Sequence, residues 1–212
     1  MSIEQPTLLP EAIYEALRSS IIAQTDAPGS TVTESAVSLR FGVARQTAKS
    51  AIERLVAEGL LRREVHQAAR VPELTRDDIV DLFENRAIVE TAAVARLTAI
   101  PAAALAAHLA LREADDFAPF DIAFHRSLVE GQPSHRLTRM HALLMGEVEL
   151  CIGQVQANHL LTAGEVAAQH QGILDAIVAG DTALAEKLTS DHIAGSRDRL
   201  LAHVDSTKGT TW

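Results

Sequence analysis

Four residues in the second half of the chain have the types and spacing of metal ligands. Asp121 and His125 are four apart, so a helix would place both on one face, about one turn apart. His170 and His192 lie on either side of Gly180-Asp181, a pair that allows a tight reversal between two helices. Antiparallel pairing of those helices would bring the two imidazoles to nearly the same height. Three histidines and one aspartate suit zinc, nickel or a similar divalent ion.

Spacing alone leaves a second interpretation open, in which these are amphipathic helices with scattered polar residues. The remaining histidines are expected at the surface or at helix caps: His108, His135, His141, His159 and His203. Arg126 follows His125 directly, so on a helix it points about 100° away, toward another helix or solvent. We therefore expect no role for Arg126 in the metal site.

The elements that position these residues are predicted to be helices throughout the second half of the chain. Thr75 is expected to cap a helix that reaches about Thr98, with Asp77 and Asp78 in the first turn, where the helix dipole favours them. Breaks follow at Pro101, around 115–119, at 131–133, around 157–162 and at 180–181. This pattern predicts about six helices in an all-helical domain over residues 73–212.

The first 72 residues have a different order, with three helices followed by two short strands. The helices are expected over about 10–24, 34–40 and 44–58, the second capped by Thr33 and the third followed by Gly59. A small hairpin is expected over 60–65 and 69–71, and Pro72 closes the domain. The order predicts a winged helix-turn-helix, so the whole fold is mainly α.

In such a motif the second helix lies in the major groove, and its first residues touch base edges. Arginine can grip guanine and glutamine can grip adenine, each through two hydrogen bonds, whereas lysine suits a phosphate. The expected DNA-contacting residues are Arg45, Gln46, Thr47, Lys49 and Ser50 on the helix, and Arg62, Arg63, His66 and Arg70 on or beside the wing. The alternative is that these are solvated charges on an ordinary helical domain.

The net charge of −9 argues by itself against nucleic acid binding, but the charge is unevenly placed. Residues 1–72 carry eight acidic and eight basic side chains, and the rest of the chain carries 20 acidic and 11 basic ones. A neutral N-terminal part with clustered arginines can still meet a phosphate backbone. The lone Cys151 permits neither an intrachain disulfide nor a cysteine zinc site. With no secretory signal and no long apolar run, we expect a cytoplasmic protein without a membrane span.

The segment PGSTVTESAVSLRFGVARQTAKSAIERLVAEGLL resembles the DNA-binding domain of the GntR family. The matching positions are Thr33-Glu34, Gly42-Val43, Arg45, Ala51-Ile52 and the stretch from Leu55 to Leu60. Departures are Ala44 in place of the usual Ser, Ala48-Lys49-Ser50 in place of Val-Arg-Glu, and the wing tip 66–69 in place of glycine and arginine. The resemblance implies a DNA-binding winged helix-turn-helix, and the departures bear on operator sequence and affinity.

The second half resembles the FCD effector domain of the FadR subfamily within GntR. The cues are Phe83, Arg86 and Glu90, then Asp121, Phe124 and His125, then His170, Ile173, Gly180-Asp181 and His192. The resemblance implies that Asp121, His125, His170 and His192 bind a metal in a helical cavity, and that the effector is a small organic acid. Arg86 could bind its carboxylate or simply pair with Glu90. Because the family's extra arginines are missing before His170, Gln154 and Asn158 are candidate effector contacts.

Together these patterns predict a ligand-responsive transcription regulator, expected to be a repressor, that binds a pseudo-palindromic double-stranded DNA operator as a homodimer. It is not expected to be an enzyme. Two alternatives stay open: a helical metalloenzyme using a metal-activated water, and a metal-binding protein with a vestigial DNA-binding domain. The metal could also hold three helices together without sensing anything.

Overall fold

The structure, a computed structural model, describes residues 10–208. These residues form two compact units, and the chain passes from the first to the second between Leu74 and Thr75. The sequence pattern placed this division after Pro72. Residues 1–9, on which the expectation of no secretory signal partly rests, lie outside the described residues.

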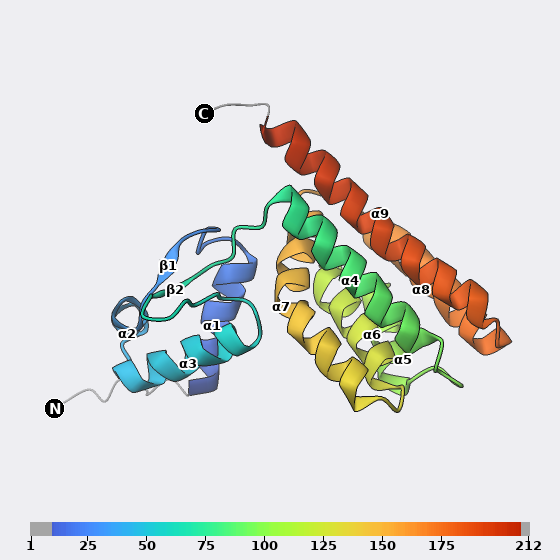
Figure 1. The fold of residues 1–212 in the computed structure, drawn as a ribbon, viewed down its shortest axis with the longest axis horizontal. Coiled ribbons are helices and arrows are strands. Elements are labelled where there is room, and N and C mark those ends of the chain that lie inside the picture. Colours follow the sequence, from blue (N-terminus) through green and yellow to red (C-terminus); the bar gives the residue numbers. More distant parts are fainter. Residues whose placement is uncertain (1–9, 209–212) are drawn as a thin grey trace. The chain divides into compact units, whose positions relative to one another are not determined.

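The first unit is a small three-helix fold with a short sheet (Figure 1). Its elements are α1 (Pro10–Ile22), β1 (Thr31–Val32), α2 (Glu34–Phe41), α3 (Arg45–Ala57) and β2 (Ala69–Arg70). Helix α3 packs against both α1 and α2. The four-residue spacing of Ile13, Leu17 and Ile21 forms the apolar stripe that α1 buries, as predicted. Ile52 and Leu55 of α3 are fully buried in the same unit.

The turn between α2 and α3 follows the sequence prediction closely. Thr33 caps α2, its hydroxyl accepting a hydrogen bond from the backbone N–H of Ala36 at 3.1 Å. Gly42 ends the helix in the left-handed conformation, with φ of 64°, which glycine adopts without steric cost. The Ser38 hydroxyl then donates to the Val43 carbonyl at 2.6 Å and holds the chain as it enters α3.

The wing differs from the predicted hairpin. Strand β2 pairs antiparallel with β1, a strand that the sequence analysis missed, and the strand expected over 60–65 is reduced to one bridge between Arg62 and Arg70. Leu60 and Leu61 are both buried, so this segment lacks the alternation of a half-exposed strand. Strand β1 has only two residues, too few to show a period in the sequence.

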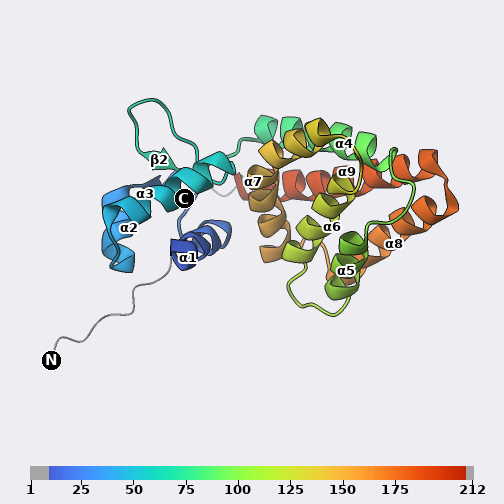
Figure 2. The ribbon, with the colours of Figure 1, turned by 90° about the horizontal axis from the view of Figure 1, so that it is seen from below.

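The second unit is an all-helical bundle whose described part has the predicted six helices (Figures 1 and 2). They are α4 (Arg76–Val94), α5 (Ala102–Leu111), α6 (Ala118–Glu130), α7 (His135–Ala157), α8 (Ala163–Ala179) and α9 (Thr182–Lys208). Helix α4 lies along α9, with α6 and α7 also against it, while α8 packs on α9 and α5 on α6. Helices α1 and α4 end at Ile22 and Val94, slightly earlier than expected.

Local sequence signals explain where these helices begin and reverse. Thr75 and Asp78 form a reciprocal capping box at the start of α4, and Thr162 and Glu165 form another at the start of α8. Gly180, with φ of 68°, makes the tight reversal into α9. Within residues 10–208 we find no helix long and apolar enough to cross a bilayer. The reversal at Gly180 brings His170 and His192 onto paired helices.

Candidate functional site

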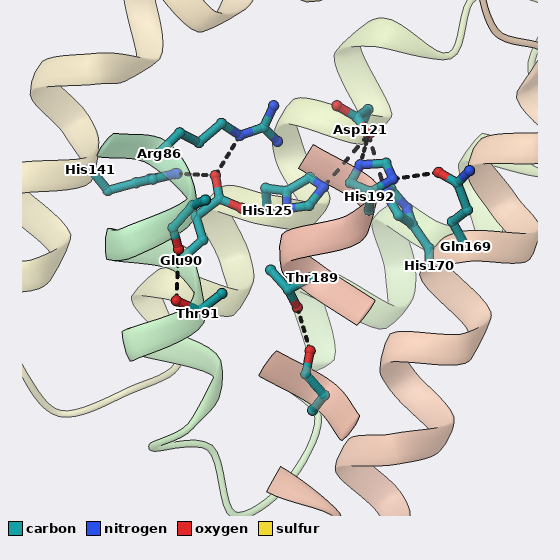
Figure 3. A network of polar contacts seen from close by, with 12 residues as sticks. Arg86, Glu90, Thr91, Asp121, His125, His141, Gln169, His170, Thr189 and His192 are labelled. Carbon is teal, nitrogen blue, oxygen red and sulfur yellow. Dashed lines mark hydrogen bonds and ion pairs between the residues drawn. The ribbon is translucent and has the colours of Figure 1, made fainter. Parts of the chain in front are cut away.

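The four predicted metal ligands come together inside the helical unit (Figure 3). Helix α6 supplies Asp121 and His125, α8 supplies His170 and α9 supplies His192. Oδ1 of Asp121 lies 3.7 Å from Nε2 of His125, 3.1 Å from Nε2 of His170 and 3.5 Å from Nε2 of His192. All four side chains are at most 3 % exposed. The antiparallel register predicted from the sequence therefore brings residues from three helices to one point.

This donor set fits a divalent ion. Zinc binds histidine nitrogen and carboxylate oxygen at about 2.0–2.2 Å, which sets neighbouring tetrahedral ligand atoms roughly 3.3–3.5 Å apart. The three distances from Asp121 bracket that value, and all four ligand atoms lie within 4.8 Å of one another. The three Nε2 atoms are buried and form no aligned hydrogen bond with the protein. Buried polar atoms without partners are rare, and here they share one small volume.

The charge states of the cluster also suit a cation. Burial alone would raise the pKa of Asp121, but the close polar contacts of its carboxylate with His170 and then His192 outweigh this effect and hold that pKa well below its usual value. Burial lowers the pKa of His170 to about 3, against a smaller opposing effect of Asp121. At neutral pH the site therefore combines a carboxylate with a neutral imidazole, and metal coordination requires both.

Two histidines have outer partners on the ring nitrogen that faces away from the cluster. Nδ1 of His192 lies 2.6 Å from Oε1 of Gln169, and Nδ1 of His125 lies 2.6 Å from Oε2 of Glu90. The hydrogen bond to Gln169 places the ring proton of His192 on Nδ1 and leaves Nε2 as a lone pair. The contact of His125 with Glu90 is short but is not aligned as a hydrogen bond. The His170 ring instead stacks on Phe124, with ring centroids 3.8 Å apart. These contacts orient the rings toward Asp121.

The sequence left two roles open for Arg86, a structural ion pair with Glu90 and a contact with the effector carboxylate. Its Nε donates to Oε1 of Glu90 at 2.7 Å, and the whole side chain is buried. Its Nη1 and Nη2 groups are buried and have no partner among the described residues. Burial would lower the pKa of Arg86, but the charges of Glu90 and Asp121 raise it, so the guanidinium stays charged. The pair with Glu90 therefore leaves two N–H ends available to an anion.

The other effector candidates lie apart from this cluster in the contacts we observe. Asn158 donates to the Gln154 carbonyl at 2.9 Å at the end of α7, and within residues 10–208 no hydrogen bond joins either side chain to the cluster. Arg126 reaches Glu149 of α7 at 3.1 Å. It faces another helix, as expected.

Two histidines expected at the surface are buried instead, so that expectation was wrong for His108 and His141. His108 is 1 % exposed and lies 3.1 Å from Gln171, whereas His141 is 2 % exposed and lies 3.0 Å from Glu90. A signal was present in the sequence, because each continues an apolar helical stripe. For His108 the stripe is Ala104, Ala107 and Leu111; for His141 it is Met145 and Val148.

The predicted DNA-reading residues lie at the start of α3 and around the wing. Arg45 and Gln46 are exposed, and neither side chain has a partner among the described residues. Lys49 lies 3.6 Å from Glu53, one turn along the same helix. Thr47 is half-buried, and the exposed Ser50 bonds its own helix backbone. At the start of α3, Arg45 and Gln46 are therefore the side chains best exposed for contact with DNA.

The wing residues differ in their exposure and in the contacts of their side chains. Arg63 pairs with Glu34 of α2 at 3.0 Å, and one end of Arg70 donates to the Gly29 carbonyl at 3.1 Å. Arg62 and His66 are exposed, and His66 sits at the tip with φ of 64°. Arg63 thus braces the wing against α2, a structural role that sequence reasoning did not assign.

Comparison with known protein families assigns both units of the chain. The family model described as "FCD domain" matches residues 81–195, and that described as "Bacterial regulatory proteins, gntR family" matches residues 9–71. The chain belongs to the GntR family, with an FCD domain. It is a DNA-binding transcription regulator rather than an enzyme, as the sequence predicted.

Similar proteins cover nearly the full length of this GntR-family regulator. The "Probable D-xylose utilization operon transcriptional repressor" of Paenarthrobacter nicotinovorans is 29% identical over 82% of this chain and 80% of its own. The crystal structure of a GntR transcriptional regulator from Rhodococcus sp. RHA1 has a TM-score of 0.70 at 24% identity, covering 91% of this chain and 97% of that one. The structure of E. coli McbR/YncC has a TM-score of 0.70 at 16% identity, and the match covers 93% of this chain and 99% of that one. The two structures share the fold, and the narrower assignment to the FadR subfamily stays a prediction.

Proposed function

We propose that this GntR-family regulator is a repressor whose helical unit binds one divalent ion and a small carboxylate. Asp121, His125, His170 and His192 would hold the ion, with zinc or nickel the best match to the donor set. The observation that carries the proposal is the convergence of these four buried donors from three helices. When bound, the ion supplies a local positive charge that attracts an anion to an open coordination position.

The buried charges favour an effector with one carboxylate. With neutral histidines, Asp121 cancels one of the two charges of a divalent ion, and Glu90 cancels the charge of Arg86. One positive charge remains, and buried charges are stable only when they are compensated. The unpartnered Nη1 and Nη2 groups of Arg86 supply donors for a carboxylate. Gln154 and Asn158 remain candidates for its uncharged part.

The DNA side of the proposal rests on the start of α3. Arg45 and Gln46 would touch base edges, with Thr47 and Ser50 beside them, and Lys49, Arg62 and Arg70 would contact phosphates. His66 and Arg63 would contribute at the wing. Two copies would bind a pseudo-palindromic operator as a homodimer in the cytoplasm, because a two-fold DNA site needs a two-fold protein. The repressor title of the Paenarthrobacter relative supports repression as the sign.

The first experiment is metal content of the untagged protein by elemental mass spectrometry, beside a His170→Ala, His192→Ala double variant. We expect about one zinc or nickel per chain in the wild type and none in the variant. A matched control replaces His135 and His159, both exposed, by alanine and keeps the metal. Wild-type protein that takes up neither zinc nor nickel would overturn the metal centre while leaving DNA binding intact.

A second candidate role for the metal is structural. The ligands join α6, α8 and α9, so an ion could simply stabilise the bundle. A gel shift on the protein's own upstream DNA separates the two roles, since sensing requires that a monocarboxylate changes DNA affinity of the metal-loaded protein. If only thermal stability responds to the metal, and no carboxylate changes DNA binding, the metal is structural.

A further inference from the structure

His141 is a buried side chain that the proposed metal centre does not use directly. Its Nε2 lies 3.0 Å from Oε1 of Glu90, an oxygen that also accepts the hydrogen bond from Nε of Arg86 (Figure 3). The other oxygen of Glu90 lies 2.6 Å from Nδ1 of His125, a close polar contact whose atoms are not aligned as a hydrogen bond. A single carboxylate on α4 therefore contacts His141 of α7 and His125 of α6, and His125 is one of the candidate metal ligands.

The positions of the protons follow from the donors and acceptors in this group. Arginine is always protonated and its buried charge needs a carboxylate, so Glu90 is ionised and can only accept hydrogen bonds. His141 must then carry a proton on Nε2, and His125 must carry one on Nδ1, for either contact to be attractive. This arrangement leaves Nε2 of His125 as a lone pair directed at Asp121, as a metal ligand requires.

His141 also restricts how the carboxylate can turn. Arg86 and His141 together occupy the two acceptor sites of Oε1 of Glu90. The other carboxylate oxygen, Oε2, lies beside His125. With Arg86 alone, Glu90 could rotate about its terminal torsion, which is broad and has no sharp minimum of its own. The second donor, coming from a different helix, fixes the plane of the carboxylate and keeps Oε2 at His125.

We propose that His141 is a positioning residue of the metal centre, acting through Glu90 to orient His125. The inference rests on the proposed function, because it requires a metal ion at the cluster. Outer partners of metal-binding histidines change metal affinity by about 10–100-fold when they are removed. His141 acts one contact further out, so its loss weakens zinc binding by roughly the lower end of that range.

The test measures zinc affinity of the full chain by competition with a chromophoric chelator, and the visible spectrum of the cobalt(II) form. His141→Phe removes the donor and fills the space, whereas His141→Gln keeps an N–H near the same position. We expect His141→Phe to bind zinc about tenfold more weakly and to have an altered cobalt spectrum. His141→Gln should recover most of the lost zinc affinity. The control, Thr189→Val, removes a buried hydroxyl that bonds only its own helix, and leaves both readouts unchanged.

A double-variant cycle shows whether His141 acts through Glu90. Glu90→Asp keeps a charge beside Arg86 but shortens the side chain, and His141→Phe should add no further loss in that background. Zinc affinity unchanged in His141→Phe, or effects that multiply in the double variant, would overturn the inference. If circular dichroism shows that His141→Phe does not fold, the smaller His141→Leu takes its place. If the wild-type protein binds neither zinc nor cobalt, the proposed function itself is wrong. That result differs from the two outcomes that overturn only the role of His141.

Discussion

The guanidinium of Arg54 lies over the ring of Tyr14, 3.5 Å from the ring centroid, and joins α3 to α1. The same Arg54 pairs with Glu58 at 3.1 Å and with Glu11 at 2.8 Å. The Tyr14 hydroxyl donates to Glu58 at 2.5 Å, so the phenol, the carboxylate and the guanidinium form one connected group. This group links α1 to α3 within the first unit.

The environment of Tyr14 predicts a titration that can be read directly, because it is the chain's single tyrosine. Burial, followed by the hydrogen bond to Glu58, raises the pKa of Tyr14 from 10.0 to about 12. The neutral phenol therefore contributes stability that is fully present below pH 10 and is lost as the pH rises through about 12. Absorbance at the phenolate band should show a midpoint near 12, and Tyr14→Phe should abolish it. A midpoint at 10 in folded protein would contradict the contact.

Ala44 predicts a stabilising substitution at the start of α3. It occupies the N-cap with φ of −63° and ψ of 147°, the conformation of a capping residue, yet makes no side-chain cap bond. Ala44→Ser supplies the missing acceptor, and we expect a gain of about 0.5–2 kcal/mol in the free energy of unfolding. Denaturant titration of the full chain measures it. The control, Ala57→Ser at the other end of the same helix, should give no gain; equal effects of both would refute the capping argument.

Gly131 predicts a destabilising substitution at the end of α6. A β-carbon at this position would overlap the ring of Pro101, which belongs to the loop before α5 and cannot rotate away. Gly131→Ala should therefore lower the free energy of unfolding by about 1–3 kcal/mol. Gly164, in the first turn of α8, has nothing within 4 Å of the added carbon. Gly164→Ala should be neutral or slightly stabilising, and a loss of stability there comparable to Gly131→Ala would count against the packing explanation.

The sequence predicted those parts of the fold that have a local signal. Thr75, Thr33 and Gly180 mark helix ends by capping chemistry, and the spacing of Asp121 and His125 fixes one face of α6 without tertiary information. Strand β1 could not be predicted, because its pairing with Ala69 and Arg70 joins residues far apart in the chain. The same reason hid the network around Glu90.

The histidines show why a residue type is a weak guide to its position. An unpaired histidine usually prefers the surface, so His141 was expected there, although it continues the apolar stripe of Met145 and Val148. Its burial depends on Glu90, and that partner lies on another helix. The pair of Arg86 and Glu90, by contrast, is visible as a four-residue spacing, but only the structure shows that Nη1 and Nη2 remain unpartnered.

Arg45 and Lys49 should differ in how they affect operator binding. If Arg45 contacts a base edge, Arg45→Ala costs about 1–3 kcal/mol of affinity and relaxes discrimination at one operator position. If Lys49 contacts a phosphate, Lys49→Ala weakens all sequences about equally and lowers the salt dependence by roughly one unit. Fluorescence anisotropy over a range of salt concentrations, with single-base operator variants, distinguishes these effects.

The exposed Arg112 of the helical unit is the control, and Arg112→Ala should change neither the operator affinity nor its salt dependence. If Arg45→Ala lowers affinity uniformly and keeps the base preference, then Arg45 is a phosphate contact and base recognition must come from Gln46 or the wing.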